Sequence, residues 1–253
     1  MEGDGVTLKD RLRARELLAG TWVKTPHPHV VEVLALSPLD CIVLDAEHAP
    51  FDRVSLDSCI LAARAAGKPV LVRPASASHE NLLQALDGGA AGVICPHVRS
   101  AQEARELVRA CHYGPGGRGF AGSTRAAGYS TLGMVKHREA AKDIVVIAQI
   151  EDAEALEQID AIAAVDGVDA LFIGRADLTI SMGANGADDP QVVAAVDRIC
   201  AAGKSAGMPV GMFLARVADV HDWRTKGASL FVLQSDQEFM LNGAATLVDA
   251  IRK

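Results

Sequence analysis

The stretch Val43-Leu-Asp-Ala-Glu-His-Ala-Pro50 decides the fold, because a short apolar run ends there in three titratable residues. The run from Cys41 to Leu44 predicts a buried strand, and Asp45, Glu47 and His48 follow it directly. In parallel α/β folds the ligand lies outside the carboxyl ends of the strands. The stretch therefore predicts an active site at a strand end. The simpler alternative is a helix cap formed by Asp45, with His48 in solvent.

Seven further apolar runs give the chain a regular alternation. The eight expected strands are Gly20–Lys24, Cys41–Leu44, Pro69–Val72, Gly92–Cys95, Ile144–Ile150, Ala170–Ile173, Pro209–Leu214 and Ser229–Leu233. Stretches with helical spacing lie between most of them, at Arg53–Ala66, His79–Asp87, Ala101–Cys111, Ala153–Val165, Gln191–Ala206 and Ala215–Lys226. Eight alternating units predict an α/β fold closed as a (β/α)8 TIM barrel. We expect one domain over residues 1–253, with an additional terminal helix over Glu238–Lys253.

Length and charge restrict the class of protein. The 253 residues match the roughly 250 residues of a typical barrel. A net charge of −7 argues against a nucleic-acid or anionic-membrane partner. The N-terminus lacks the pattern of a secretory signal, and no apolar stretch is long enough to span a bilayer. Five scattered cysteines without a CxxC pair indicate reduced core thiols, so we expect a cytoplasmic protein.

Polar side chains recur where the later strands end. They are Arg73 after the third strand, His97 after the fourth, Gln149 and Glu151 at the fifth, and Gly174 to Asp177 after the sixth. Core packing gives no reason for such groups at successive strand ends. We therefore expect them to converge at one mouth of the barrel.

Glu151 and Asp177 end consecutive strands, so their carboxylates are expected side by side. Two carboxylates repel each other unless a cation lies between them, and hard divalent ions accept such ligands. The alternative is that each residue caps the helix that follows it. Arg73 needs either a carboxylate partner, such as Asp45 or Glu47, or an anionic ligand. These two interpretations of Arg73 are compatible.

Several residues are ambiguous from the sequence alone. His48 is either an acid/base group or a solvated loop residue, and His97 is open in the same way. The glycine-rich loop from Tyr113 to Arg125 fits an anion cradle, a lid or a subunit contact. Asp87 most simply ends a helix.

Taken together, these motifs resemble a known family. Leu44-Asp-Ala-Glu-His-Ala-Pro50, Val72-Arg-Pro74, Leu86-Asp-Gly-Gly-Ala90, Gln149-Ile-Glu151 and Gly174-Arg-Ala-Asp-Leu178 occur in order. The chain resembles the HpcH/HpaI aldolases, the class II pyruvate aldolases that include 4-hydroxy-2-oxoheptanedioate aldolase and 2-dehydro-3-deoxyglucarate aldolase. The similarity runs from about residue 21 to residue 232.

The resemblance implies a function. It implies that the chain is a lyase. It also implies a homohexamer, in which a terminal helix is exchanged between barrels. The reaction would be reversible cleavage of 4-hydroxy-2-oxo acids to an aldehyde and pyruvate, or a close analogue such as hydroxypyruvate, through a metal-bound enolate. The metal would be magnesium, manganese or cobalt, with no organic cofactor.

The resemblance also assigns roles to individual residues. Glu151 and Asp177 would be the metal ligands, and Gln149 would lie close to pyruvate. Arg73 would hold the C2 oxygen, His48 would be the acid/base residue, and Asp45 would support both. Gly174 and Ala176 would offer backbone to the carboxylate, and Asp87 would come from a neighbouring subunit, beside the aldehyde.

Two departures and two rival functions qualify this assignment. The family often has Pro where this chain has Arg175, and the stretch from Gly211 to Arg216 differs from the commoner small-residue version. One rival is a citrate-lyase-like acyl-CoA lyase, which should show a basic surface for the CoA phosphates. The other rival is a catalytically silent metal-binding barrel. Imine chemistry would need a catalytic lysine at a strand end. Lys24 ends the first expected strand but matches no family role, so the metal-dependent route is preferred.

Overall fold

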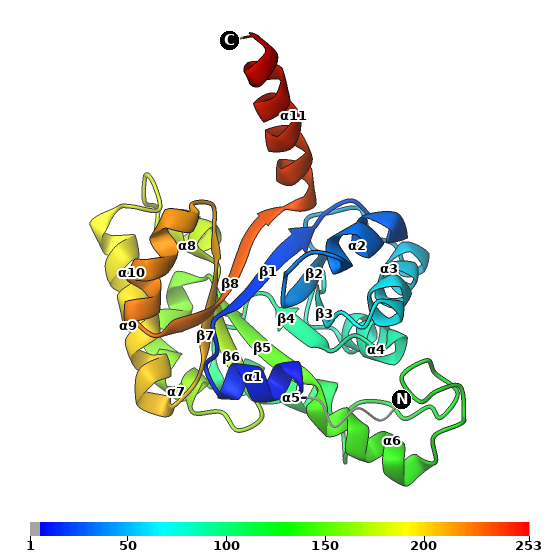
Figure 1. The fold of residues 1–253 in the computed structure, drawn as a ribbon. Coiled ribbons are helices and arrows are strands. Elements are labelled where there is room, and N and C mark those ends of the chain that lie inside the picture. Colours follow the sequence, from blue (N-terminus) through cyan, green and yellow to red (C-terminus); the bar gives the residue numbers. More distant parts are fainter. Residues whose placement is uncertain (1–5, 253) are drawn as a thin grey trace.

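A closed barrel of eight parallel strands forms the centre of the molecule (Figure 1). The computed structural model describes residues 6–252. The strands are β1 (Leu18–Val23), β2 (Cys41–Asp45), β3 (Val70–Arg73), β4 (Gly92–Cys95), β5 (Val145–Ile150), β6 (Ala170–Ile173), β7 (Val210–Leu214) and β8 (Ala228–Ser235). Each strand pairs with its neighbour in the sequence, and β8 closes on β1. The predicted TIM barrel and its eight strands are confirmed.

Helices surround the barrel. They are α1 (Leu8–Arg13), α2 (Pro28–Ala35), α3 (Arg53–Ala65), α4 (His79–Gly88), α5 (Ala101–Cys111), α6 (Met134–Ala140), α7 (Ile159–Ala163), α8 (Arg175–Ser181), α9 (Pro190–Ala206), α10 (Val220–Thr225) and α11 (Asp236–Arg252), with short 3-10 turns η1 (Ala141–Asp143), η2 (Ala153–Gln158) and η3 (Val217–Asp219). Of these, α1, α2, α6 and α8 had not been expected from the sequence. The expected terminal helix is present, although Lys253 lies outside the described residues.

Strand periodicity divides the core into two layers. On β2, Cys41 and Val43 pack inside the barrel with residues such as Leu71, Ile147 and Phe172. The intervening residues of β2, Ile42 and Leu44, pack outward against the helices. Because successive side chains of a strand point to opposite faces, the same alternation turns Asp45, Arg73 and Gln149 inward. The hydrophobic pattern thus places polar groups at the carboxyl end of the barrel interior.

The amino end of the barrel is closed by α1. Lys9 is buried, and its ammonium lies 3.1 Å from Oδ2 of the buried Asp169, which precedes β6. Lys9 also donates to the carbonyl oxygens of Lys142 and Ile144, each at 2.9 Å. A buried charge needs such pairing and hydrogen bonding to be tolerated. The barrel is therefore plugged at this end, and its open mouth is the other end.

The last helix, α11, projects away from the barrel (Figure 1). Its first residue, Asp236, is buried and accepts hydrogen bonds from the backbone N–H groups of Lys24 (2.7 Å) and Thr25 (3.1 Å). These bonds fasten the start of α11 to the end of β1. Within residues 6–252, no helix combines the length and apolar character needed to cross a membrane.

Candidate active site

Arg73 and Asp45 form a buried ion pair at the barrel mouth. Their positions are paired across β2 and β3, so both side chains enter the barrel at the same level. Nη2 of Arg73 lies 2.9 Å from Oδ2 of Asp45, and Nε donates to Oδ1 at 3.1 Å. Although burial opposes ionisation, the hydrogen bond and charge of Arg73 hold the pKa of Asp45 below its ordinary value. Asp45 is therefore ionised near neutral pH.

Two further contacts fix the guanidinium. Nε of Arg73 is 3.2 Å from Oε2 of Glu47, and its Cζ lies 4.2 Å from the centre of the Trp22 ring. Arg73 therefore contacts both of its predicted carboxylate partners. Trp22 was not expected from the sequence, where it reads as an ordinary inward residue of a strand. The planar guanidinium of Arg73 is held between these two carboxylates and the face of the Trp22 ring, and it therefore keeps one orientation.

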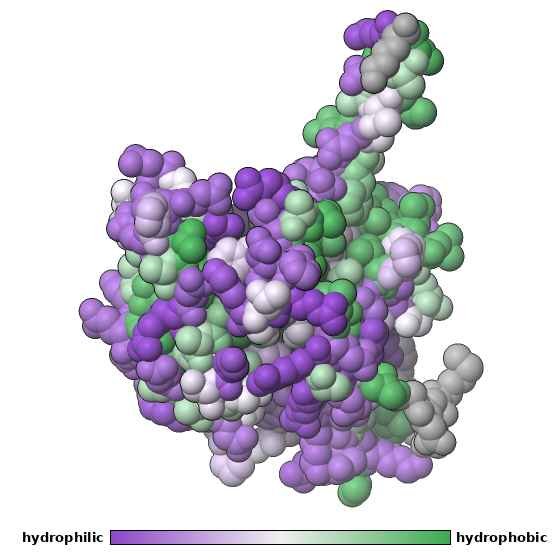
Figure 2. All heavy atoms as spheres, turned by 60° about the vertical axis from the view of Figure 1, so that its left-hand side comes forward, coloured by the Kyte–Doolittle hydropathy of each residue, from purple (hydrophilic) through white to green (hydrophobic). Residues whose placement is uncertain are grey.

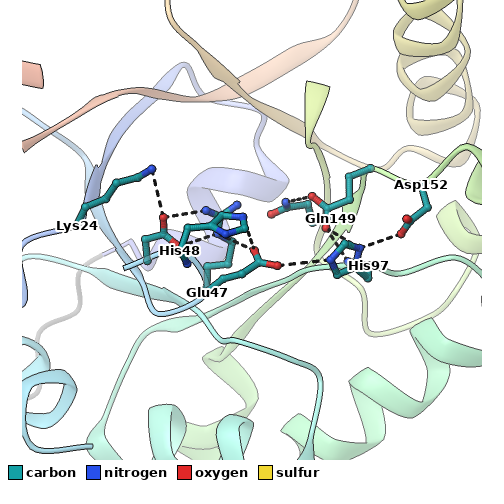
Figure 3. Close-up of polar contacts among 9 residues, drawn as sticks. Lys24, Glu47, His48, His97, Gln149 and Asp152 are labelled. Carbon is teal, nitrogen blue, oxygen red and sulfur yellow. Dashed lines mark hydrogen bonds and ion pairs between the residues drawn. The ribbon is translucent and has the colours of Figure 1, made fainter. Parts of the chain in front are cut away.

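Glu47, His97 and Glu151 form a second cluster beside this pair (Figure 3). One ligand atom from each lies within 4.8 Å of the others, the spacing of a group that could hold a metal ion. Nε2 of His97 is 3.5 Å from Glu47, and its Nδ1 is 3.3 Å from Glu151 and 3.0 Å from Asp152. Figure 3 shows Glu47 between His48 and His97.

Burial controls the charge of this cluster. It raises the pKa of Glu151, although the amide of Gln149 and the backbone N–H of His97 favour the ionised form. Burial also raises the pKa of Glu47, although the positive charge of Arg73 acts in the opposite direction. Burial lowers the pKa of His97, but its bond to Asp152 and the charge of Glu151 outweigh this and raise it. Two carboxylates that resist ionisation side by side are a favourable place for a cation.

A cavity of about 280 Å³ opens beside these groups at the mouth. Of the predicted site residues, it is lined by His48, Arg73, Gln149, Gly174, Ala176 and Asp177. Asp177 lies in the first turn of α8, and the group of potential ligands around Glu151 does not include it. The structure thus gathers most of the predicted residues around one cavity. Two larger hollows, of about 700 and 550 Å³, lie by the loop after α5 instead.

Gly174 is required by close packing against Glu151. A Cβ at this position would lie 2.6 Å from Oε2 of Glu151 and 3.1 Å from Nε2 of Gln149. The same amide donates a hydrogen bond to Oε2 of Glu151, while Oε1 of Gln149 is buried without a hydrogen-bond partner among the described residues. Because position 174 has no side chain, the carboxylate of Glu151 can lie against the backbone there while it accepts the hydrogen bond from Gln149.

Replacing Gly174 by alanine should displace the Glu151 carboxylate, because the added methyl group would overlap it. Groups that orient metal ligands typically change affinity or activity about 10- to 100-fold, so a loss of Mn²⁺ affinity on this scale is expected. Calorimetric titration with Mn²⁺ measures it. Gly186→Ala is the control, because nothing lies within 4 Å of a Cβ at that position. Equal Mn²⁺ affinity in the two variants would contradict the prediction.

Both departures from the family pattern lie at the rim of the cavity. Arg175 lines it and donates from Nη2 to the carbonyl oxygen of Ala187 (2.5 Å) and to Asp188 (2.9 Å). The Arg175 guanidinium also lies 5.3 Å from the Trp223 ring. Phe213 supplies an apolar wall from β7. This side of the cavity therefore combines one cation with one aromatic ring.

Asp87 lies elsewhere in the same chain. It is in the last turn of α4, as the sequence indicated, and forms an ion pair with Arg118. It does not line the cavity of His48 and Arg73, but a separate hollow between α3, α4 and the loop after α5. Its predicted role concerns a neighbouring subunit, and a single chain does not test that role.

A closed parallel barrel with ionisable groups at the carboxyl ends of its strands has the architecture of a barrel enzyme. Residues 18–243 match the family model described as HpcH/HpaI aldolase/citrate lyase. The chain belongs to this family of lyases, which confirms the resemblance stated above.

Named relatives are similar over nearly the whole chain. The hydroxypyruvate/pyruvate aldolase of Paraburkholderia phytofirmans is 35% identical, covering 97% of each chain. The 5-keto-4-deoxy-D-glucarate aldolase of Klebsiella pneumoniae is 32% identical, covering 97% of this chain and 96% of its own. A crystal structure of a family protein from Burkholderia cenocepacia superposes with a TM-score of 0.93 at 32% identity, covering 98% of this chain and all of that one.

Proposed function

We propose that this chain is a divalent-metal-dependent aldolase. It cleaves 4-hydroxy-2-oxo acids reversibly to an aldehyde and pyruvate, or a close analogue such as hydroxypyruvate. The observation that carries the proposal is the fixed Arg73 guanidinium beside a cavity that also receives Gln149 and Asp177. The aldolase names of the relatives support the same reaction.

The residues present fit a hard divalent cation. Glu151 and Asp177 would hold it, and the unpartnered Oε1 of Gln149 offers a further oxygen beside them. Oxygen donors of this kind suit magnesium or manganese, and the family resemblance adds cobalt. When bound, such an ion supplies Lewis-acid polarisation of the 2-oxo group. Glu47 and His97 lie close enough to Glu151 to form an alternative ligand set.

The chain's own groups would then carry the proton and the charge. His48 takes the proton of the C4 hydroxyl, and the electrons of the C3–C4 bond pass into the enolate of pyruvate as the aldehyde leaves. Arg73 stabilises the charge on the enolate oxygen, and Asp45 keeps Arg73 oriented. The proton held by His48 then passes to C3 of the enolate, which gives the methyl group of pyruvate and returns His48 to its starting state. Gly174 and Ala176 line the cavity, and their backbone would bind the substrate carboxylate.

The rival functions have less support. An acyl-CoA lyase needs a basic surface for phosphates, whereas the chain carries a net charge of −7. A silent barrel would not need both the Arg73–Asp45 pair and the cluster around Glu151. The five cysteines are free and buried, which supports the proposed cytoplasmic location.

We propose a homohexamer in which α11 docks on a second copy. The exposed apolar residues of α11 are Met240, Leu241, Leu247 and Ile251, together with the less exposed Phe239 and Val248. Hydrophobic side chains run along the projecting helix in Figure 2. Val33 on α2 and Leu36 directly after it are exposed as well, so apolar surface is available on the barrel. A helix that projects with an apolar surface is stabilised by burial against a partner.

The change Leu247→Glu should therefore weaken assembly, because it would bury a charge in the proposed contact. Sedimentation velocity should show smaller species than the wild type at equal concentration. Leu247→Met, which keeps an apolar side chain, should assemble normally. A Leu247→Glu protein of unchanged mass would show that α11 does not carry the contact.

Proton exchange tests the reaction directly. Pyruvate in deuterated water should exchange its methyl protons when the protein and Mg²⁺ or Mn²⁺ are present, because enolate formation needs no aldehyde. Chelation should stop the exchange, and restoring the ion should restart it. Cleavage of a panel of 4-hydroxy-2-oxo acids would then identify the aldehyde. An absence of exchange with every divalent ion would refute the proposed function.

A further inference from the structure

The position of Asp87 is electrostatically costly. The last turn of a helix carries partial negative charge, so a carboxylate there is disfavoured unless a cation compensates. Asp87 lies in the last turn of α4, with its side chain 22% exposed beside a hollow of about 550 Å³. One of its oxygens, Oδ1, binds Arg118. Within residues 6–252, Oδ2 has no hydrogen-bond partner, so the carboxylate is held at one side and free at the other.

Arg118 is itself an unusual side chain. It belongs to the glycine-rich loop between α5 and α6, yet its side chain is only 1% exposed. Nη2 contacts Asp87, whereas Nε and Nη1 are buried and have no partner in the described part of the chain. Leaving donors of a buried guanidinium unpaired is unfavourable. Folding stability alone would favour an apolar residue here, so the cation requires a functional explanation.

An aromatic wall fixes the plane of this guanidinium. The Arg118 Cζ lies 4.8 Å from the centre of the Tyr113 ring. Tyr113 packs edge-on against Phe120 and His137, with ring centres 5.3 Å apart in both cases. The Tyr113 hydroxyl is also hydrogen-bonded to Nε2 of the buried His137, at 2.8 Å. Arg118 thus has little freedom to turn away from Asp87.

The loop also forms hydrogen bonds with the backbone at the end of α4. The N–H of Ala126 donates to the carbonyl oxygen of Asp87 at 3.1 Å. Arg125 donates to the carbonyl oxygen of Gly88 at 3.0 Å and forms an ion pair with Asp57 at 2.6 Å. Backbone and side chain of Asp87 are therefore held by separate contacts from one loop.

We propose that Arg118 is a positioning residue, which holds Oδ1 of Asp87 so that Oδ2 is presented to the acceptor aldehyde in an adjoining copy of the chain. This inference rests on the proposed aldolase function and on the role across a subunit contact that the family resemblance implies for Asp87. It adds a role for the glycine-rich loop, whose Tyr113 and Phe120 support Arg118 together with His137 of α6. Arg118 itself does not touch the substrate.

Comparing two rates in the full-length protein tests the inference. Pyruvate proton exchange needs only the cavity of Arg73, whereas aldol turnover with glycolaldehyde also needs the acceptor side. Misplacing a reacting group by about 1 Å can cost about 10²-fold in rate. Arg118→Gln should therefore lower the kcat of aldol addition about 10- to 100-fold, while pyruvate exchange and the KM for pyruvate stay near wild type. Arg118→Lys, which keeps the charge, should recover part of the loss.

Two further variants separate positioning from loop stability. Arg125→Gln removes an anchor of the same loop without touching the Asp87 side chain, so it should lower the unfolding temperature and leave the ratio of the two rates unchanged. Asp87→Asn should lower aldol turnover at least as much as Arg118→Gln does. The double variant Asp87→Asn with Arg118→Gln should be no worse than Asp87→Asn alone, because both changes remove the same contact.

Mixing variants with impaired aldol turnover tests whether His48 and Asp87 of one site come from different subunits. Arg118→Gln refolded with His48→Ala should regain activity, since some sites would combine an intact His48 with an intact Asp87. Arg118→Gln mixed with Asp87→Asn should not. Wild-type aldol turnover in Arg118→Gln, or an equal loss in Arg125→Gln, would overturn the inference. Failure of the wild type to exchange pyruvate protons would instead refute the proposed function.

Discussion

The change Glu151→Gln is expected to weaken Mn²⁺ binding by more than about 100-fold, since even groups that only orient metal ligands change affinity about 10- to 100-fold. Glutamine keeps the size of the side chain and removes its charge. Glu151 is 2% exposed and contacts Gln149 and His97, so its surroundings confine the substituted side chain. Binding is measured by Mn²⁺ electron paramagnetic resonance, which requires no turnover. The rate of aldol cleavage by Glu151→Gln should fall together with its Mn²⁺ affinity.

Matched variants distinguish the two possible ligand sets. Asp177→Asn should have the same effect as Glu151→Gln if these two carboxylates hold the ion. Glu47→Gln would be the damaging change if the ion binds among Glu47, His97 and Glu151. Glu154→Gln, the same substitution at an exposed residue three positions along the chain, is the control and should bind Mn²⁺ normally. Wild-type affinity in Glu151→Gln would contradict both sets.

Arg73→Lys is expected to slow pyruvate proton exchange by about 10²- to 10³-fold, the usual effect of losing one contact to a developing oxyanion. Lysine retains the charge but not the planar fork that Asp45, Glu47 and Trp22 hold in place. The exchange is followed by proton NMR without any aldehyde, so the acceptor side of the reaction is not involved.

Two measurements accompany the Arg73→Lys experiment. The unfolding midpoint should stay close to that of the wild type, because the lysine still compensates the buried Asp45. Mn²⁺ affinity should also persist, since Glu151 and Asp177 are untouched. Exchange at the wild-type rate would show that Arg73 serves only to neutralise Asp45 and Glu47.

The barrel could be predicted from the sequence because its strands are short apolar runs that end abruptly at polar residues. The expected strand over 92–95 and that over 170–173 agree with the structure at both ends. The helix α2 was missed because it is rich in valine, which is typical of strands, and begins at Pro28. Similarly, the expected helix over 153–165 is a 3-10 turn followed by a short α-helix. Local tertiary packing, not periodicity, decides such details.

The arrangement of the site was harder to predict from the sequence than the fold was. Strand alternation could place Asp45 and Arg73 on one face, and the predicted ion pair between them is confirmed. The approach of Glu47, His97 and Glu151 could not be read from spacing, because it depends on turns after three different strands. The contact of Arg118 with Asp87 links residues 31 positions apart through an irregular loop, for which the sequence offers no periodic signal.

The anchoring of α11 ties the shape of the mouth to the direction of the helix. Asp236 holds the backbone at Lys24 and Thr25, while Lys24 and Glu238 both line the cavity. A rotation of α11 about this hinge point would therefore move the rim residues together with the helix. Under the proposed assembly and function, substitutions on the surface of α11 would thus be constrained twice, once by the second copy on which the helix docks and once by the substrate that enters beside its first residues.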